Sequence, residues 1–355
     1  MIAGHIREGV RQPDTGPDRA WSEWDQFVES RPDSGFMQTS WWAEFRAFSG
    51  YEYFGSVVRK DGAIVGGATV LRFAHASDAC FYYIQDGPIL PEDRELASET
   101  MDVILDNIEQ HRRREGKTVT HLRLEPRWLS MPAFLSGYRP LPALADPFTE
   151  PRDTLCVAVD ADDESLLAGM KPKGRYNIRL AKRHGIDVCE DNSARGIADF
   201  IELYAETAER QALNAKPDDY FETLVPALDA LGKGGIHFAE LGGQRLAAAI
   251  VVYFGRRATY LFGGSTERLR HLMAPYALHF GIMREARARG CRWYDLWGIA
   301  PSGASAHPWE GITAFKRKFG GVEVNLTATL DRVYDQAAYR QYAADNCGSD
   351  FLSLP

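Results

Sequence analysis

Hydrophobic and polar residues alternate along several stretches of the first half of the chain, as is typical of half-buried strands. Residues 53–70 form the longest of these stretches, and Asp61-Gly62 in its middle predicts a tight turn between two strands. An aromatic run follows, then the turn residues Asp86-Gly87-Pro88. The first half therefore predicts a hairpin over 53–70, a strand over 81–84, a helix over 94–114 and a strand over 121–125.

The second half repeats this order of elements, and matching landmarks lie about 170–180 residues apart. The repeated elements are a hairpin over 236–253 with a Gly242-Gly243 turn, a strand over 257–262, a turn over 263–265, a helix over 275–289 and a strand over 291–296. A meander followed by a crossover helix and a returning strand gives a mixed sheet with helices on its faces. We therefore predict two copies of one α/β unit, against the alternative that hairpins and helices recur by chance.

Further helices are predicted over 163–170, 173–184, 194–211 and 331–344. The polar stretch between Pro147 and Pro151 suits a domain junction. The predicted domains are residues 20–155 together with 330–355, and residues 156–329. Residues 1–19 are polar, contain Pro13 and Pro17, and lack the apolar core of a signal peptide, so we predict a loose tail there.

Composition excludes several classes of protein. The net charge of −8 argues against wrapping long nucleic acid, but leaves room for a local basic patch that contacts the end of an RNA. Five scattered cysteines without a CxxC motif argue against a disulfide framework and a zinc ribbon, and favour reduced thiols in a cytoplasm. The longest apolar run, residues 246–254, is too short to span a membrane. The nine histidines show no metal-ligand spacing, and a monomer is the default expectation.

Two segments carry candidate chemistry. Residues 171–183 contain six basic residues and no acidic one, and Arg175, Arg179 and Arg183 share one helix face with Lys182 beside it. Near the end of the chain, Phe315-Lys316 follows the strand at 291–296, so a ring and an ammonium lie next to each other. A site for an anionic donor that carries a base needs both groups. The alternatives are a solvated helix face and a solvated basic turn with a packed Phe.

An ordered set of segments over about residues 20–345 resembles the FemABX aminoacyltransferases. Residues 170–185 are similar to the family's K-x-R-x-N-I-R-x-A segment, and 294–299 and 311–320 to its Y-D-x-x-G-I and F-K-x-x-F-G signatures. Residues 36–45, 122–126, 200–210 and 220–221 fit other segments of the family. The resemblance implies two tandem GNAT-like domains with mixed sheets flanked by helices, of the compact FemX-like type. It implies transfer of an amino acid from aminoacyl-tRNA to an amine of a UDP-MurNAc-peptide, which needs no cofactor or metal.

The resemblance also implies roles for individual residues. Lys316 would offset the charge of the oxyanion or terminal phosphate and Phe315 would pack on the terminal adenosine, while Glu125 is a candidate base. Domain 1 would bind the acceptor and domain 2 the tRNA. Candidate substrate contacts are Trp42, Arg46 (where the family often has Lys), Tyr83, Arg210, Tyr220 and Tyr260. Candidate tRNA contacts are Lys173, Arg175, Arg179, Lys182, Arg183, Arg317 and Lys318.

Alternatives stay open for these residues and for the function. Glu125 is equally a structural ion-pair or capping residue, and buried tyrosines are commonly core residues. An acyl-CoA donor ranks lower, because the segment Arg317–Val322 departs from the complete (Q/R)-x-x-G-x-(G/A) signature at its last position. The acceptor is alternatively a peptide natural product, or the chain is a non-catalytic module that binds an RNA end or a nucleotide sugar.

Overall fold

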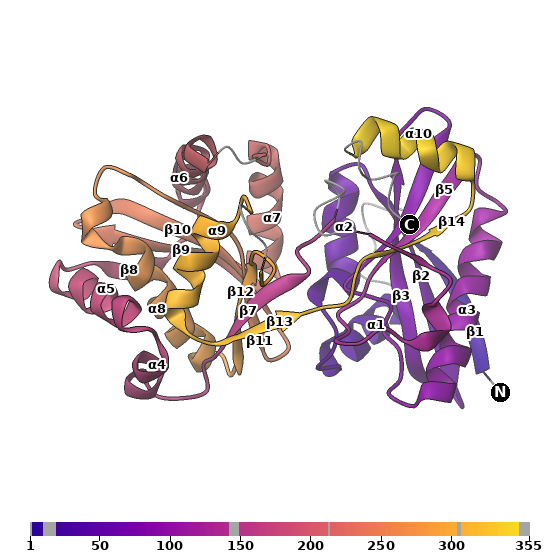
Figure 1. Cartoon of the computed structure of the whole chain (residues 1–355), viewed down its shortest axis with the longest axis horizontal. Coiled ribbons are helices and arrows are strands. Elements are labelled where there is room, and N and C mark those ends of the chain that lie inside the picture. Colours follow the sequence, from indigo (N-terminus) through magenta and orange to yellow (C-terminus); the bar gives the residue numbers. More distant parts are fainter. Residues whose placement is uncertain (1, 10–18, 142–148, 212–213, 304–306, 348–355) are drawn as a thin grey trace. The chain divides into compact units, whose positions relative to one another are not determined.

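The computed structural model of the chain describes residues 2–9, 19–141, 149–211, 214–303 and 307–347 (Figure 1). The chain forms two compact units. Unit 1 comprises Met1–Arg152 and Asn325–Pro355, and unit 2 comprises Asp153–Val324. The chain thus leaves unit 1 after Arg152 and returns to it after Val324.

Unit 1 contains a seven-stranded sheet in the order β1-β2-β3-β4-β5-β14-β6. All neighbouring strands are antiparallel except β4 and β5, which run parallel from Ala79↔Thr118 to Gln85↔Glu125. The strands are β1 (Ile2–Gly9), β2 (Glu52–Lys60), β3 (Ala63–Ala74), β4 (Ala79–Gln85), β5 (Thr118–Glu125), β6 (Arg139–Pro140) and β14 (Leu330–Val333). The helices are α1 (Arg19–Ser30), α2 (Ser40–Phe48), α3 (Arg94–Arg112) and α10 (Gln336–Asn346), with short 3₁₀ turns η1 (Phe36–Gln38) and η2 (Ala133–Leu135).

Two predictions for unit 1 are wrong. Ile2–Gly9, predicted as part of a loose tail, form the edge strand β1, whose backbone pairs with β2 from Ile2↔Lys60 to Gly9↔Tyr53. Residues 331–344 were predicted as one helix, but Leu330–Val333 pair with β5 and the helix begins only after Asp335. The Asp335 carboxylate accepts the N–H groups of Ala337 and Ala338, which fixes the start of α10.

Unit 2 contains a second seven-stranded sheet in the order β13-β7-β12-β11-β10-β9-β8. The strands are β7 (Asp153–Ala158), β8 (Asp187–Glu190), β9 (Gly234–Leu241), β10 (Gln244–Phe254), β11 (Arg257–Ser265), β12 (Trp293–Gly298) and β13 (Val322–Asn325). The helices are α4 (Asp163–Gly169), α5 (Pro172–Arg183), α6 (Ala194–Gln211), α7 (Asp218–Ala230), α8 (Ala274–Ala288) and α9 (Glu310–Lys316), with 3₁₀ turns η3 (Arg270–Leu272) and η4 (Arg317–Phe319).

The turn predicted over 263–265 is wrong, because β11 continues through these residues and pairs with β10 as far as Ala247↔Ser265. Gly264 allows helix α6 to lie close to this strand, since a Cβ at that position would lie 2.3 Å from the carbonyl carbon of Leu203. Gly264 therefore allows close packing of α6 on the sheet.

Each unit buries its own hydrophobic core. In unit 1, helix α3 packs Met101, Ile104 and Ile108 onto the sheet residues Phe54, Val70 and Ile84. In unit 2, helix α8 packs Leu278, Ile282 and Met283 onto Ala249, Val251 and Leu296. These aliphatic and aromatic contacts fix the sheets on which the polar residues of the candidate sites stand.

Candidate functional site

Lys316, the last residue of α9, is a buried cation in unit 2. Its side chain is about 5% exposed, and its ammonium Nζ donates a hydrogen bond to the carbonyl oxygen of Gly298 over 2.6 Å. Burial lowers the pKa of Lys316 to about 7, although the charge of Asp295 acts in the opposite direction. The Lys316 side chain can therefore exchange a proton near neutral pH.

A bulge in strand β12 presents the Gly298 carbonyl to Lys316. The pairing of β12 with β7 shifts between Asp295 and Gly298, and Trp297 has a left-handed backbone with φ 61°. The fully buried Asp295 holds this bulge, since its carboxylate accepts the Trp297 N–H over 2.9 Å and the Thr154 hydroxyl. Arg257 completes the arrangement, with its guanidinium 3.3 Å from the same carboxylate.

Aromatic rings lie beside the Lys316 ammonium and around the neighbouring Phe315. The centroid of the Tyr260 ring lies 5.7 Å from Nζ. The half-buried Phe315 packs between Tyr276 at 5.1 Å, Phe319 at 5.2 Å and His279 at 5.4 Å. Burial, with a smaller effect from Lys316, lowers the pKa of His279 to about 3, so this imidazole is neutral. The Lys316 ammonium therefore lies next to a cluster of neutral aromatic rings.

The parallel strand pair stays paired over different lengths in the two units. In unit 1, β4 and β5 stay paired to their ends at Gln85↔Glu125. In unit 2, β11 and β12 are paired only over Arg257↔Trp293, Ala258↔Tyr294 and Thr259↔Asp295. The strands separate where the bulge begins, and Tyr260 is the first residue of β11 beyond the paired region.

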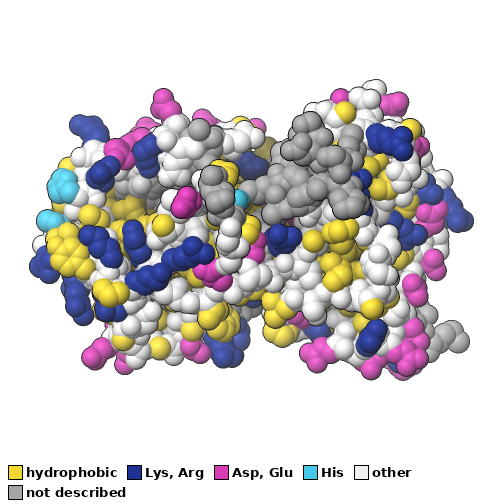
Figure 2. All heavy atoms as spheres, in the orientation of Figure 1, with side chains coloured by type: hydrophobic (Ala, Val, Ile, Leu, Met, Phe, Trp, Pro, Cys, Tyr) yellow, Lys and Arg dark blue, Asp and Glu magenta, His cyan; other side chains and the backbone are white. Residues whose placement is uncertain are grey.

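Most of the basic residues predicted to contact tRNA lie on the outer face of α5. Lys and Arg side chains gather over this part of unit 2 in the space-filling view (Figure 2). Lys173, Arg179, Lys182 and Arg183 are exposed. Arg175 differs from them, because its guanidinium donates to the carbonyls of Ala168 and Met170 at the end of α4.

The two cations after Lys316 are held by neighbouring residues. Arg317 forms a two-pronged ion pair with Glu323, with N···O distances of 2.6 and 3.2 Å. The Lys318 ammonium donates to the Tyr276 hydroxyl over 3.1 Å. Both side chains therefore have part of their hydrogen-bonding capacity already used.

Glu125 is the centre of a second cluster, in unit 1. Its carboxylate accepts hydrogen bonds from the Tyr83 hydroxyl, from the Glu150 N–H over 2.9 Å and from the Thr329 hydroxyl over 3.2 Å. Burial, together with the nearby charge of Glu150, raises the pKa of Glu125 to about 8. This carboxyl group can exchange a proton near neutral pH, as a general acid or base must.

Gln85 joins the predicted unit 1 residues into one network. Its side-chain oxygen accepts from the Trp42 indole over 3.3 Å and from Arg46 over 3.2 Å, and its amide donates to Glu150 over 3.2 Å. Trp42, Arg46, Tyr83 and Glu125 are thus brought together through Gln85 and Glu150. Sequence reasoning missed both connecting residues. The signal for Gln85 was its place two residues after Tyr83, on the same face of the strand.

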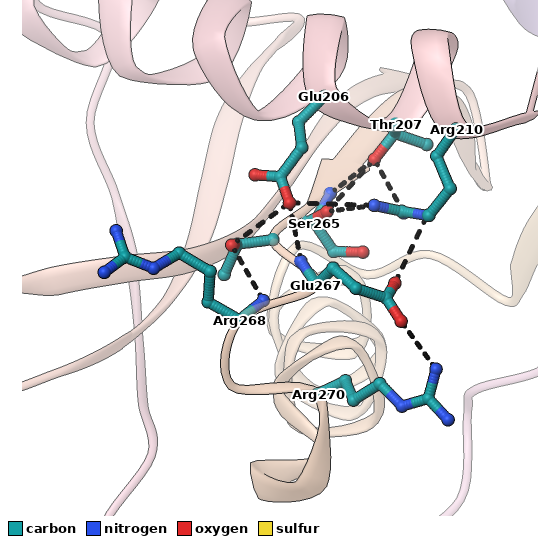
Figure 3. A network of polar contacts seen from close by, with 8 residues as sticks. Glu206, Thr207, Arg210, Ser265, Glu267, Arg268 and Arg270 are labelled. Carbon is teal, nitrogen blue, oxygen red and sulfur yellow. Dashed lines mark hydrogen bonds and ion pairs between the residues drawn. The ribbon is translucent and has the colours of Figure 1, made fainter.

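Arg210 and Tyr220, the other predicted substrate contacts, belong to unit 2. Arg210 donates to the Ser265 carbonyl and the Thr207 hydroxyl, each over 3.2 Å, and lies 3.5 Å from Glu267 and 3.8 Å from Glu206 (Figure 3). Tyr220 packs edge-on against Phe262, with 5.6 Å between ring centroids, and the Lys216 ammonium lies 5.6 Å from its ring. Arg210 therefore ties α6 to the end of β11.

Comparisons with known proteins agree on one family and fold. The model of the FemAB family matches residues 144–230 and 236–344. The lipid II:glycine glycyltransferase of Staphylococcus aureus strain COL is 22% identical, over 90% of this chain and 92% of that protein. The crystal structure of FemX superposes with a TM-score of 0.80 at 20% identity, covering 90% of this chain and 98% of that one. A tandem GNAT protein from the clavulanic acid pathway gives 0.51 at 12% identity, covering 93% and 97%.

The predicted fold of two tandem GNAT-like α/β units is confirmed by these superpositions. Among the described residues, every helix is too short or too polar to cross a lipid bilayer.

Proposed function

Because the chain belongs to the FemAB family, we propose that it transfers an amino acid from aminoacyl-tRNA to an amine of a UDP-MurNAc-peptide or another peptidoglycan precursor. The predicted resemblance to the FemABX aminoacyltransferases is confirmed, and the chain is an aminoacyltransferase. The similar glycyltransferase carries lipid II in its name, which supports a cell-wall precursor as the acceptor here. We place the reaction in the cytoplasm, with the chain acting as a monomer.

The buried Lys316 ammonium on the Gly298 carbonyl is the observation that supports this chemistry most directly. The neutral acceptor amine attacks the ester carbonyl carbon of the aminoacyl group, and negative charge develops on the carbonyl oxygen. When this intermediate collapses, the new C–N bond remains, the bond to the ribose oxygen breaks, and that oxygen takes up a proton. A buried ammonium stabilises an oxyanion more strongly than one in bulk water, because the electrostatic attraction is stronger at a lower dielectric constant.

Phe315 and Tyr260 frame Lys316, and we assign them to the terminal adenosine and the aminoacyl group. The parallel pairing of β11 with β12 ends at Thr259↔Asp295, just before Tyr260 and the bulge that holds Lys316, and this difference from unit 1 supports unit 2 as the donor side. The exposed cations of α5 supply the positive charge that the RNA phosphates need.

We assign acceptor binding to unit 1, where Trp42, Arg46 and Tyr83 surround the Glu125 cluster. Glu125, with its pKa near 8, is the proposed base that receives the proton of the attacking amine. Arg210 and Tyr220 stay predicted substrate contacts. The pairing of Arg210 with Glu206 and Glu267 means that a substrate phosphate has to compete with two carboxylates for it.

The direct test incubates the purified protein with a mixed pool of charged tRNAs and with candidate acceptors, and follows products by mass spectrometry. The proposal predicts that UDP-MurNAc-pentapeptide or lipid II gains the mass of one amino acid residue. Extension of other peptides alone would reassign the acceptor to a peptide natural product. Failure to extend any acceptor with any charged tRNA would favour the alternative that the chain is a non-catalytic module that binds an RNA end or a nucleotide sugar.

A further inference from the structure

The outer face of α5 carries an aromatic ring among its cations. Tyr176 is 52% exposed, and it lies three residues before Arg179 and seven before Arg183, so these side chains follow one line along the helix. The opposite face of the helix buries Gly174, Asn177, Ile178 and Ala181. The Lys173 ammonium lies 5.6 Å from the centroid of the Tyr176 ring.

This combination is unusual within unit 2. Tyr176 is the only exposed Phe, Tyr or Trp among the residues that the structure describes there. No acidic residue interrupts residues 171–183, and Arg179, Lys182 and Arg183 form no ion pair within the described part of the chain. Surfaces that bind single-stranded nucleic acid combine cations for the phosphates with an aromatic face for a base. The charge of this face therefore complements an RNA strand.

Helix α5 is also anchored beside the Lys316 segment. The Lys171 N–H, at the start of α5, donates to the Lys318 carbonyl over 3.1 Å. A Cβ on Gly174 would lie 2.3 Å from the same carbonyl oxygen, so the helix backbone touches η4 directly. Because Lys318 is only two residues beyond Lys316, an RNA end that reaches Lys316 passes close to α5.

We propose that Tyr176 stacks on an unpaired base near the 3′ end of the donor tRNA, while Arg179, Lys182 and Arg183 contact its phosphates. Tyr176 is then a specificity residue for single-stranded RNA. The inference rests on the proposed function, since it takes the RNA to be the donor of the transfer reaction.

Binding of uncharged RNA tests the inference without catalysis. Two fluorescent RNA hairpins are compared, one ending in four unpaired 3′ nucleotides and one blunt, and affinity is measured by anisotropy. Tyr176→Ala should weaken binding of the hairpin with the overhang about 5- to 100-fold and leave the blunt hairpin nearly unaffected, because stacking needs an unpaired base. Tyr176→Phe should retain the wild-type affinity, because the ring remains.

Two further variants separate stacking from charge and from general surface effects. Arg183→Gln should weaken both hairpins and reduce the slope of log affinity against log salt by about 1. Leu231→Ala, which truncates a side chain of the same unit that is 47% exposed, should change neither affinity.

The outcomes distinguish this inference from the proposed function. Equal losses on both hairpins, or unchanged binding by Tyr176→Ala, would overturn stacking even if the wild-type enzyme transfers amino acids. Conversely, a Tyr176 effect confined to the overhang, with no transfer from any charged tRNA, would support the RNA surface and reject the transferase proposal.

Discussion

The Lys316 ammonium donates its hydrogen bond to a main-chain carbonyl, that of Gly298, and not to a carboxylate. Lys316→Met keeps the volume of the buried side chain and removes the ammonium. We expect kcat to fall about 10²- to 10³-fold, as for loss of one group that stabilises an oxyanion, with little change in the KM for charged tRNA. Steady-state kinetics with varied tRNA concentration measure both quantities. An unchanged kcat would remove Lys316 from catalysis.

Asp295 sets both the shape and the protonation of this site. Asp295→Asn keeps an oxygen that can accept the Trp297 N–H, but it removes the negative charge that raises the pKa of Lys316. The protonated form of Lys316 is the active one, and its fraction falls as pH rises through its pKa near 7, while the active, ionised fraction of Glu125 rises through its pKa near 8. The variant should therefore match the wild type at acidic pH, where Lys316 is protonated in both proteins, and fall below it as the pH rises to neutral.

The pH dependence of kcat/KM for both proteins checks this prediction. Asp295→Ala is the matched comparison, because it also removes the acceptor that holds the bulge, and it should lower activity at every pH. If the ratio of the two kcat/KM values stays constant from acidic to neutral pH, Asp295 does not control the charge of Lys316.

Candidate site residues could be identified from the sequence where their position next to neighbouring residues was enough to single them out. Phe315 and Lys316 were found because they are adjacent, and Glu125 because it ends a strand. Gln85, Glu150 and the bulge at Trp297 were missed, because their roles depend on partners from other elements. Tertiary contacts determine these roles, and one sequence carries no record of them.

At the scale of elements, the contact of α5 with η4 depends on the absence of a side chain at residue 174. Gly174→Ala places a methyl group 2.3 Å from the Lys318 carbonyl oxygen, so the helix or the turn has to move. We expect a loss of about 1–3 kcal/mol in the free energy of unfolding, together with weaker RNA binding. Chemical denaturation and the hairpin binding assay measure the two effects.

Gly169→Ala is the matched control for this prediction. A Cβ at Gly169, at the end of α4, meets no atom within 4 Å, so the change should be neutral or slightly stabilising. Equal effects of the two substitutions would show that close packing of α5 on η4 does not matter.

Most elements were predictable because each has a strong periodicity of its own. The predicted helix over 194–211 coincides with α6, and the hairpin over 53–70 with β2 and β3. The helix predicted over 331–344 starts too early. Asp331 forms an ion pair with the buried Arg123 of β5, and the residues around Asp331 pair with β5 as a strand. Local propensity cannot reveal such a distant partner.

At the scale of the whole molecule, unit 1 depends on a segment that follows unit 2 in the chain. Asp331 on β14 accepts two hydrogen bonds from Arg123 on β5, at 2.9 and 2.8 Å, and one from Tyr339 on α10 at 2.7 Å. Asp331→Asn should lower the free energy of unfolding by about 3–5 kcal/mol, because it removes the carboxylate charge that pairs with the buried Arg123 guanidinium.

Calorimetry of the full chain measures this loss. Arg340→Gln, an exposed substitution on α10, is the control and should shift the melting temperature very little. A melting temperature for Asp331→Asn equal to that of the control would show that the ion pair contributes nothing to unit 1.

The return of the chain to unit 1 also determines the order in which the protein is completed during translation. When the ribosome has made residues 1–152, the unit 1 sheet still lacks β14, and Asp331, which accepts hydrogen bonds from Arg123 in the folded protein, has not yet been made. Every strand of unit 2 is synthesised before β14 emerges from the exit tunnel. We therefore expect that nascent unit 1 needs protection from aggregation throughout the synthesis of unit 2, and that the second unit in the sequence is the first to reach its native state.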